Sequence, residues 1–192
     1  QAHKMKKLLL YCCFLILFSF ISCQEDTSST SQSYLAIGDN YTIGESISES
    51  QSWPIQLINL ITEKNIHLSS PRIIAKTGWT TDELKTEINN STLDYPYDWV
   101  SLLIGVNNQS RGRSIQEFRK QFETLLSDAI TFSGNKKDKV FVVSIPDWGV
   151  MPFAEDLDKE QIATEIDNFN QIIYEICTIK GINFIDITPI SR

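Results

Sequence analysis

Histidine and cysteine are scarce in this sequence, and their scarcity excludes several kinds of site. Only two of the 192 residues are histidine, His3 and His67. Beyond residue 33 the only cysteine is Cys177, so no disulfide can form within that part of the chain. Spacings that bind zinc are absent, as is a glycine-rich loop that binds phosphate. The sequence therefore predicts no metal and no cofactor, and it predicts that Cys177 fills core space.

Basic residues are also few, with 17 Lys and Arg against 24 Asp and Glu. Removal of residues 1–22 as a targeting segment leaves 14 basic side chains against 24 acidic ones, a net charge of −10. Such a charge is unfavourable for binding a polyanion, so nucleic acid is excluded as a partner. The apolar share of 42% suits a globular protein, and the remaining length suits one domain of ordinary size.

The N-terminus has the pattern of an export signal. Lys6 and Lys7 precede an apolar run of 14 residues, 8–21, which is too short to span a membrane. The run ends in Phe-Ile-Ser-Cys at 20–23, which is similar to a bacterial lipobox. We expect cleavage after residue 22, lipid attachment at Cys23 and anchoring to the outer membrane. The alternatives are simple cleavage without lipid, or a cysteine that merely ends an apolar run.

Two further segments follow the targeting segment. Residues 23–33 are polar and rich in serine and threonine, which predicts a flexible tether. Residues 34–192 then form the domain. Because Met5 reads as the start, and because no closing helix follows the last strand-like run, we expect the chain to be a partial translation.

The domain alternates between two kinds of segment, which predicts a three-layer α/β/α sandwich around a five-stranded parallel sheet. Short apolar runs rich in Val, Ile and Leu are typical of parallel strands that are covered on both faces. These runs are 34–38, 72–76, 99–104, 139–145 and 182–187.

Segments with helical periodicity lie between the runs. We expect helices to begin at Ser52, at the capping box Thr80–Glu83 and at the capping box Ser114–Glu117. Glycines 134 and 181 are expected to end two of them. The predicted buried stripes are Trp53, Leu57, Leu60 and Ile61; Phe118, Phe122, Leu125, Leu126 and Ala129; and Ile162, Ile166, Phe169, Ile173 and Ile176.

Three motifs follow three of the predicted strands. Gly38-Asp39-Asn40 follows the first, Thr77-Gly78-Trp79 the second and Gly105-Val106-Asn107-Asn108 the third. In this order they resemble the signature blocks of the GDSL or SGNH hydrolases, which read Gly-Asp-Ser in the first block. The resemblance covers residues 34–192 and implies a flavodoxin-like sheet with the strand order 2-1-3-4-5.

The resemblance also implies roles for individual residues. Position 40 is the nucleophile position, which a serine occupies in active relatives and Asn40 occupies here. The expected oxyanion donors are the backbone N–H groups of residue 40 and Gly78 and the side-chain amide of Asn107. An asparagine has no hydroxyl that a base could activate. The family's last block, Asp-x-x-His, is absent, and His67 is expected at the end of the sheet opposite the cleft.

Other residues have less specific interpretations. Asp147 and Trp148 follow the fourth strand and are candidates for substrate contact, or they form an ordinary turn. Asp39 and Asn40 could simply turn the chain from strand to helix. Asn40-Tyr41-Thr42 also matches a glycosylation sequon.

Two functions from different classes are consistent with these residues. The first is a GDSL-type hydrolase for acyl esters of lipids or sugars, inactive as written because of Asn40. The second is a non-catalytic lipoprotein that holds an acylated ligand in the same cleft. A receiver-like domain that uses Asp39 is weaker, because no phosphate cradle and no additional metal-binding acids accompany it.

Overall fold

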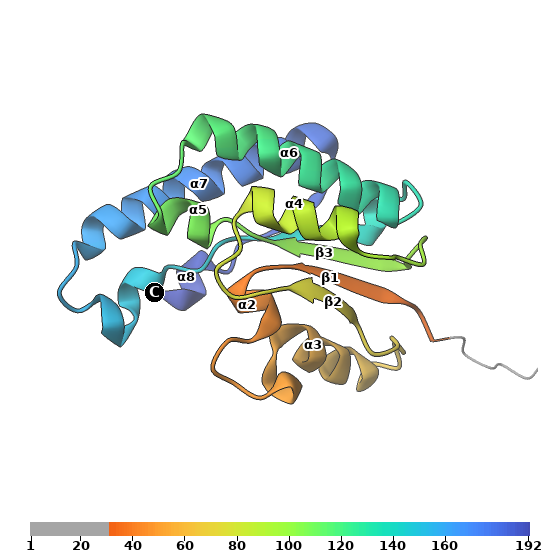
Figure 1. Cartoon of the computed structure of the whole chain (residues 1–192). Coiled ribbons are helices and arrows are strands. Elements are labelled where there is room, and N and C mark those ends of the chain that lie inside the picture. Colours follow the sequence, from red (N-terminus) through yellow and green to blue (C-terminus); the bar gives the residue numbers. More distant parts are fainter. Residues whose placement is uncertain (1–30) are drawn as a thin grey trace, which may run out of the picture. The chain divides into compact units, whose positions relative to one another are not determined.

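The computed structural model describes residues 31–192, in which five parallel strands form one sheet (Figure 1). The strand order is β2-β1-β3-β4-β5, as the resemblance implied. The strands are β1 (Tyr34–Gly38), β2 (Arg72–Ala75), β3 (Trp99–Leu103), β4 (Val140–Val143) and β5 (Asn183–Ile185). They are up to three residues shorter than the apolar runs predicted. The predicted signal segment and Cys23 lie outside the described residues.

The start of the domain differs slightly from the prediction. Gln32 and Ser33 belong to the predicted tether, yet both are bonded to the domain. The backbone N–H of Gln32 donates to the carbonyl of His67 at 2.9 Å, and that of Ser33 donates to Asp98 at 2.8 Å. The ordered domain therefore begins at least two residues before Tyr34.

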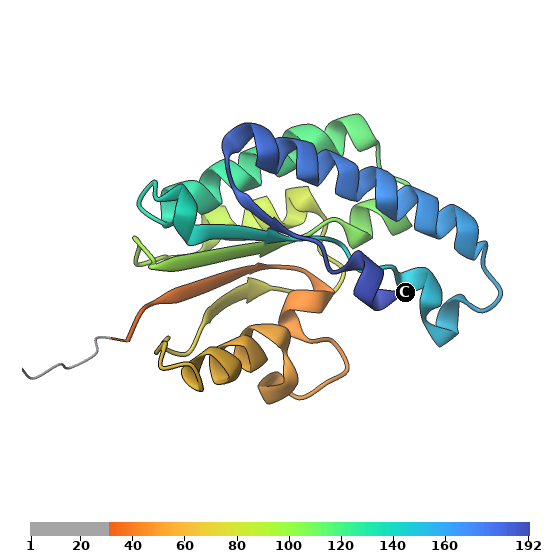
Figure 2. The same cartoon turned by 180° about the vertical axis from the view of Figure 1, so that it is seen from behind.

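Helices cover both faces of the sheet, which confirms the three-layer sandwich. Figures 1 and 2 show α4, α6 and α7 on one face and α3 on the other. The α-helices are α2 (Asn40–Ile43), α3 (Trp53–Thr62), α4 (Thr81–Asn90), α5 (Val106–Ser110), α6 (Ile115–Phe132), α7 (Lys159–Lys180) and α8 (Thr188–Ser191). Short 3₁₀ turns are η1 (Glu49–Gln51), η2 (Lys137–Lys139), η3 (Trp148–Val150) and η4 (Pro152–Ala154).

The main core lies between the sheet and the helices α6 and α7. The predicted stripes of both helices are buried, and the aromatic ring of Phe118 packs 4.6 Å from that of Phe169. Burying one such side chain stabilises the fold by roughly 2 kcal/mol. Cys177 is fully buried in this core, and burial raises its pKa to about 12. Its predicted role as core filler is confirmed.

The helix starts were predicted with mixed success. The reciprocal capping box of Thr80 and Glu83 is present. Ser114 accepts from the backbone N–H of Glu117, but the returning half of that box is missing because the Glu117 carboxylate accepts from Gln121 instead. Ser52 precedes α3 without making a side-chain cap bond, and its buried hydroxyl has no partner. Gly134 and Gly181 follow α6 and α7 in left-handed conformations, as expected.

The stripe predicted for α3 is only partly buried. Leu60 is 58% exposed, so its predicted burial is wrong. Beside α3 lies an apolar groove of about 270 Å³ against the sheet, lined in part by Leu57, Trp99 and Phe141. Within the described part of the chain, no helix is long and apolar enough to cross a membrane.

Candidate active site

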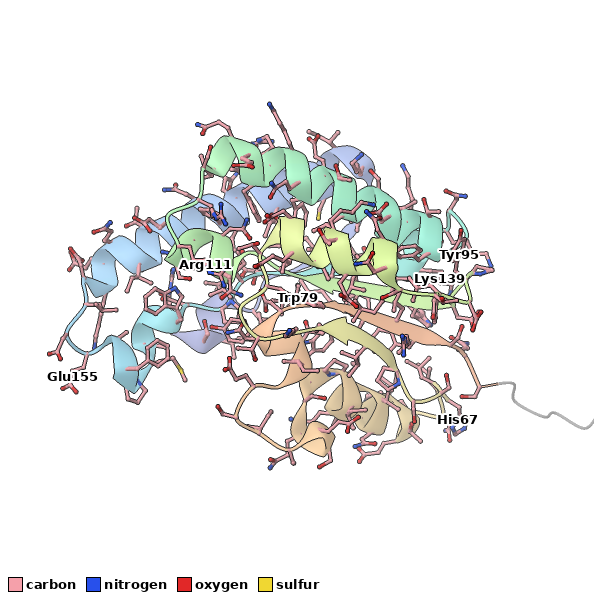
Figure 3. The ribbon with its side chains drawn as sticks, viewed as in Figure 1. His67, Trp79, Tyr95, Arg111, Lys139 and Glu155 are labelled. Atoms are coloured by element: carbon pink, nitrogen blue, oxygen red, sulfur yellow. The ribbon has the colours of Figure 1, made fainter. Side chains whose placement is uncertain are left out.

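The three motif residues meet at the carboxyl end of the sheet. Asn40 begins α2 and is separated from β1 only by Asp39, Gly78 lies between β2 and α4, and Asn107 lies in α5 after β3. In Figure 3, the neighbouring side chains of Trp79 and Arg111 lie at this end of the sheet, whereas His67 lies at the other. His67 is the only histidine among residues 31–192, so the described part of the chain places no histidine at the site.

The side chain of Asn40 connects the three motifs. Its Oδ1 accepts from the backbone N–H of Gly78 at 2.9 Å and from Nδ2 of Asn107 at 2.9 Å. Its own Nδ2 donates to Oε2 of Glu45 at 3.0 Å. Two of the three donors that the resemblance assigned to an oxyanion therefore bind the side-chain oxygen of Asn40, the residue expected at the nucleophile position.

The neighbours fix which end of the Asn40 carboxamide is the oxygen. A backbone N–H can only donate, so the Asn40 atom that faces Gly78 must be an acceptor. Asn107 is oriented in the same way, because its Nδ2 also donates to the carbonyl of Trp79 at 2.9 Å. A carboxylate can only accept, so Glu45 faces the amide nitrogen of Asn40.

Glycines allow the backbone to reach this geometry. A Cβ at Gly38 would collide with the side chain of Thr42 and the carbonyl of Leu103. Gly78 has a φ of 86° and Gly105 a φ of 135°, values that disfavour any residue with a Cβ. The turn after each of the first three strands thus depends on a glycine, which brings the polar groups together.

Asp39 lies beneath the site and has an unusual environment. Its Oδ1 caps α2 by accepting from the backbone N–H of Tyr41 at 3.2 Å, while its Oδ2 is buried without a partner. Burial raises the pKa of this carboxyl to about 7. Burial, together with the charges of Asp39 and Asp147, also raises the pKa of Tyr41 to about 12.

The two adjacent asparagines of α5 have different tasks. Asn107 faces Asn40, whereas Asn108 turns toward α4 and bonds to Thr81. Oδ1 of Asn108 accepts from the Thr81 backbone N–H at 3.1 Å, and its Nδ2 donates to the Thr81 hydroxyl at 2.8 Å. Asn108 therefore fixes α5 against the start of α4 and with it the position of Asn107.

Two charged residues at the site were missed in the sequence. Glu45 follows α2 and accepts from Asn40. Arg111, at the end of α5, donates from Nη2 to the carbonyl of Gly78 at 2.5 Å and from Nη1 to Glu83 at 3.3 Å. Arg111 thus holds the loop whose N–H group points at Asn40. Neither residue belongs to a motif, so only the fold could reveal them.

Asp147 and Trp148 lie at the same end of the sheet and are held by internal contacts. Oδ1 of Asp147 accepts from the N–H of Gly149 at 2.9 Å, and its Oδ2 accepts from Nε of Arg192 at 2.8 Å. The indole N–H of Trp148 donates to Gln109 at 2.7 Å. Their contact with substrate stays a prediction.

Among residues 31–192, no group of three or more metal-ligating side chains occurs.

Comparison with known proteins points to one family. The model of the GDSL-like Lipase/Acylhydrolase family matches residues 36–192. Among solved structures, the chain is similar to AlinE4, described as a SGNH-hydrolase family esterase, with 18% identity, coverage of 80% of this chain and 75% of that one, and a TM-score of 0.63. The chain is also similar to a lipase/acylhydrolase from Enterococcus faecalis, with 20% identity, coverage of 83% of this chain and 78% of that one, and a TM-score of 0.62. No curated protein matches the chain.

Proposed function

This chain belongs to the GDSL-like lipase/acylhydrolase family, and we propose that it is a member that does not hydrolyse acyl esters and uses its cleft to hold an acylated ligand. The observation that carries this proposal is the position of the Asn40 side chain, whose oxygen accepts from Gly78 and Asn107. The two groups that we expect to bind a carbonyl oxygen are thus held in a defined geometry. The residue at the nucleophile position, however, carries an amide.

The chemistry of the site supports loss of turnover. Acyl transfer by a serine needs a hydroxyl, a base that removes its proton and donors that stabilise the oxyanion. Donors of this kind typically contribute roughly 3 kcal/mol each to lowering the barrier, and they cannot replace the nucleophile. Asn40 carries an amide instead of a hydroxyl, and His67, the only histidine among residues 31–192, lies at the other end of the sheet. A non-catalytic binding role for an acylated lipid or sugar is consistent with what remains.

Fluorophosphonate labelling tests this proposal, because the probe forms a bond only with an activated nucleophile. We expect no labelling of the 192-residue protein and no hydrolysis of p-nitrophenyl butyrate above the uncatalysed rate. Asn40→Ser in the same chain should also stay unlabelled, since serine and histidine act as a unit and repairing one recovers little. Labelling of the unmodified protein that disappears when another serine is changed would overturn the proposal.

We also propose that the protein is exported and carries lipid on Cys23, with the outer membrane as its location. The support is the sequence alone, namely the two lysines, the apolar run and the Ser22-Cys23 pair. Mass spectrometry of the protein expressed in a Gram-negative host should find an acylated N-terminal Cys23. An unmodified N-terminus at another residue would contradict the proposed lipid attachment and location.

A further inference from the structure

The Asn40 carboxamide makes the contacts that a bound primary amide would make. Its oxygen accepts two hydrogen bonds, one from the main chain at Gly78 and one from Asn107. Its nitrogen donates to the carboxylate of Glu45 at 3.0 Å. The protein therefore presents two donors and one anionic acceptor around a planar amide group.

This pattern discriminates between carbonyl compounds. An ester has a carbonyl oxygen for the two donors but no N–H group for Glu45. A carboxylate ion has an oxygen for the donors, but its second oxygen faces the Glu45 carboxylate and is repelled. A primary amide satisfies all three partners, and its bond to the carboxylate is charge-assisted.

We propose that Asn40 is an internal ligand of its own carbonyl site, and that Glu45 makes this site selective for a primary carboxamide. The inference rests on the proposed function only in that it concerns the same two donors. It goes further by stating that Asn40 competes with any external carbonyl, and by giving Glu45 a role in specificity.

The burial of these residues fits the proposal. Asn107 is 8% exposed, so its amide is held in place by its surroundings. Asn40 and Gly78 are half-buried, and Glu45 is exposed. A small amide can therefore approach from solvent once the Asn40 side chain is shortened. Arg111 holds the Gly78 carbonyl at 2.5 Å, which keeps the Gly78 N–H in position when its internal partner is removed.

The test uses the ¹⁵N-labelled full chain and follows two signals, the Gly78 N–H and the Asn107 side-chain NH₂. In the unmodified protein, butyramide and butyrate should move neither signal, because Asn40 occupies the site. In Asn40→Ala, butyramide should move both in a saturable way. Butyrate should bind at least about tenfold more weakly, since it loses the bond to Glu45 and meets repulsion there.

A second substitution tests the role of Glu45. In Asn40→Ala/Glu45→Gln the preference for butyramide over butyrate should fall below about threefold, because the glutamine oxygen can accept from the amide N–H and its NH₂ group can instead donate to the carboxylate. Asn40→Gly provides a second opened site, and the dispersion of each ¹⁵N spectrum shows whether the variant is folded. Lys120→Ala, on α6, is the matched surface control in the Asn40→Ala background and should leave the preference unchanged.

Several results would overturn the inference. Butyramide that moves both signals equally in the unmodified protein would show that Asn40 is no obstacle. Opened variants that bind neither compound, or that bind butyrate as well as butyramide, would refute the amide selectivity. These outcomes are independent of catalysis, because fluorophosphonate labelling alone decides whether the proposed loss of hydrolysis is correct.

Discussion

The side-chain oxygen of Asn40 lies 2.9 Å from the backbone nitrogen of Gly78, although 38 positions separate the two residues in the chain. The contact follows from the register of β1 and β2, in which Gly38 pairs with Ala75. A slip of one residue would move one strand end by about 3.3 Å and break the contact. The site is therefore a consequence of sheet register as much as of the residues themselves.

Substitution of Gly38 should be severely destabilising. In Gly38→Ala, the new methyl group collides with Thr42 and with the carbonyl of Leu103. We expect a loss of about 3 kcal/mol or more, because one of the obstacles is backbone and cannot rotate away. The matched control is Gly112→Ala, where φ is 62° and no atom lies within 4 Å, and which should lose only about 1–2 kcal/mol. Equal losses in urea unfolding would contradict the prediction.

Asp39 should make stability depend on pH near neutrality. The pKa of Asp39 is about 7 in the folded protein and about 3.9 in the unfolded chain. Between these two pH values, the Asp39 carboxyl therefore carries a proton in the folded state but not in the unfolded state. The contribution of Asp39 to the free energy of unfolding is thus fully present below about pH 4 and is lost as the pH rises toward 7.

Asp39→Asn removes this titration. Between pH 5 and 7 the free energy of unfolding of the unmodified protein should fall relative to that of the variant, by at most about 1.4 kcal/mol per pH unit. Urea unfolding at several pH values measures the difference. A difference that does not change with pH would show that Asp39 does not titrate in this range.

Arg111 should position Gly78 more than it stabilises the fold. The Arg111 and Glu83 side chains are each 43% exposed, and pairs this exposed contribute at most about 1 kcal/mol. The Arg111→Ala variant should therefore unfold at nearly the same urea concentration as the unmodified protein. The hydrogen of its Gly78 N–H group, however, should exchange with solvent faster. Arg119→Ala is the matched control, since its pair with Glu175 has side chains 37% and 42% exposed and lies between α6 and α7. It should leave Gly78 exchange unchanged.

Cys177 should resist alkylation while the protein is folded. Burial removes the thiol from solvent and raises its pKa to about 12, so almost no thiolate is present at pH 8. Iodoacetamide should modify the peptide that contains Cys177 only after unfolding in guanidinium chloride. Mass spectrometry of the digested protein measures this, and rapid modification without denaturant would contradict the described core.

Local patterns were sufficient to predict most of the secondary structure. The sheet could be expected because apolar runs alternate with helical stripes, and the strand order came with the family resemblance. Errors arose where spacing alone does not decide which contact a side chain makes. Leu60 has the spacing of a buried residue, but it is exposed on α3. Glu117 has the spacing of a capping box, but its carboxylate accepts from Gln121 in the same helix.

The sequence by itself determined the chemical groups of the site, because glycine turns and polar residues follow strands whose carboxyl ends share one edge. Through the family resemblance it predicted that Asn40, Gly78 and Asn107 would meet, and it showed that position 40 has no hydroxyl. Only the tertiary structure decided that the Asn40 oxygen accepts from both donors, and that Glu45 and Arg111 hold the arrangement. The reason is physical. Hydrogen bonds depend on side-chain rotamers and on loop positions, and these follow from packing across the whole sheet and cannot be predicted from neighbouring residues in the sequence.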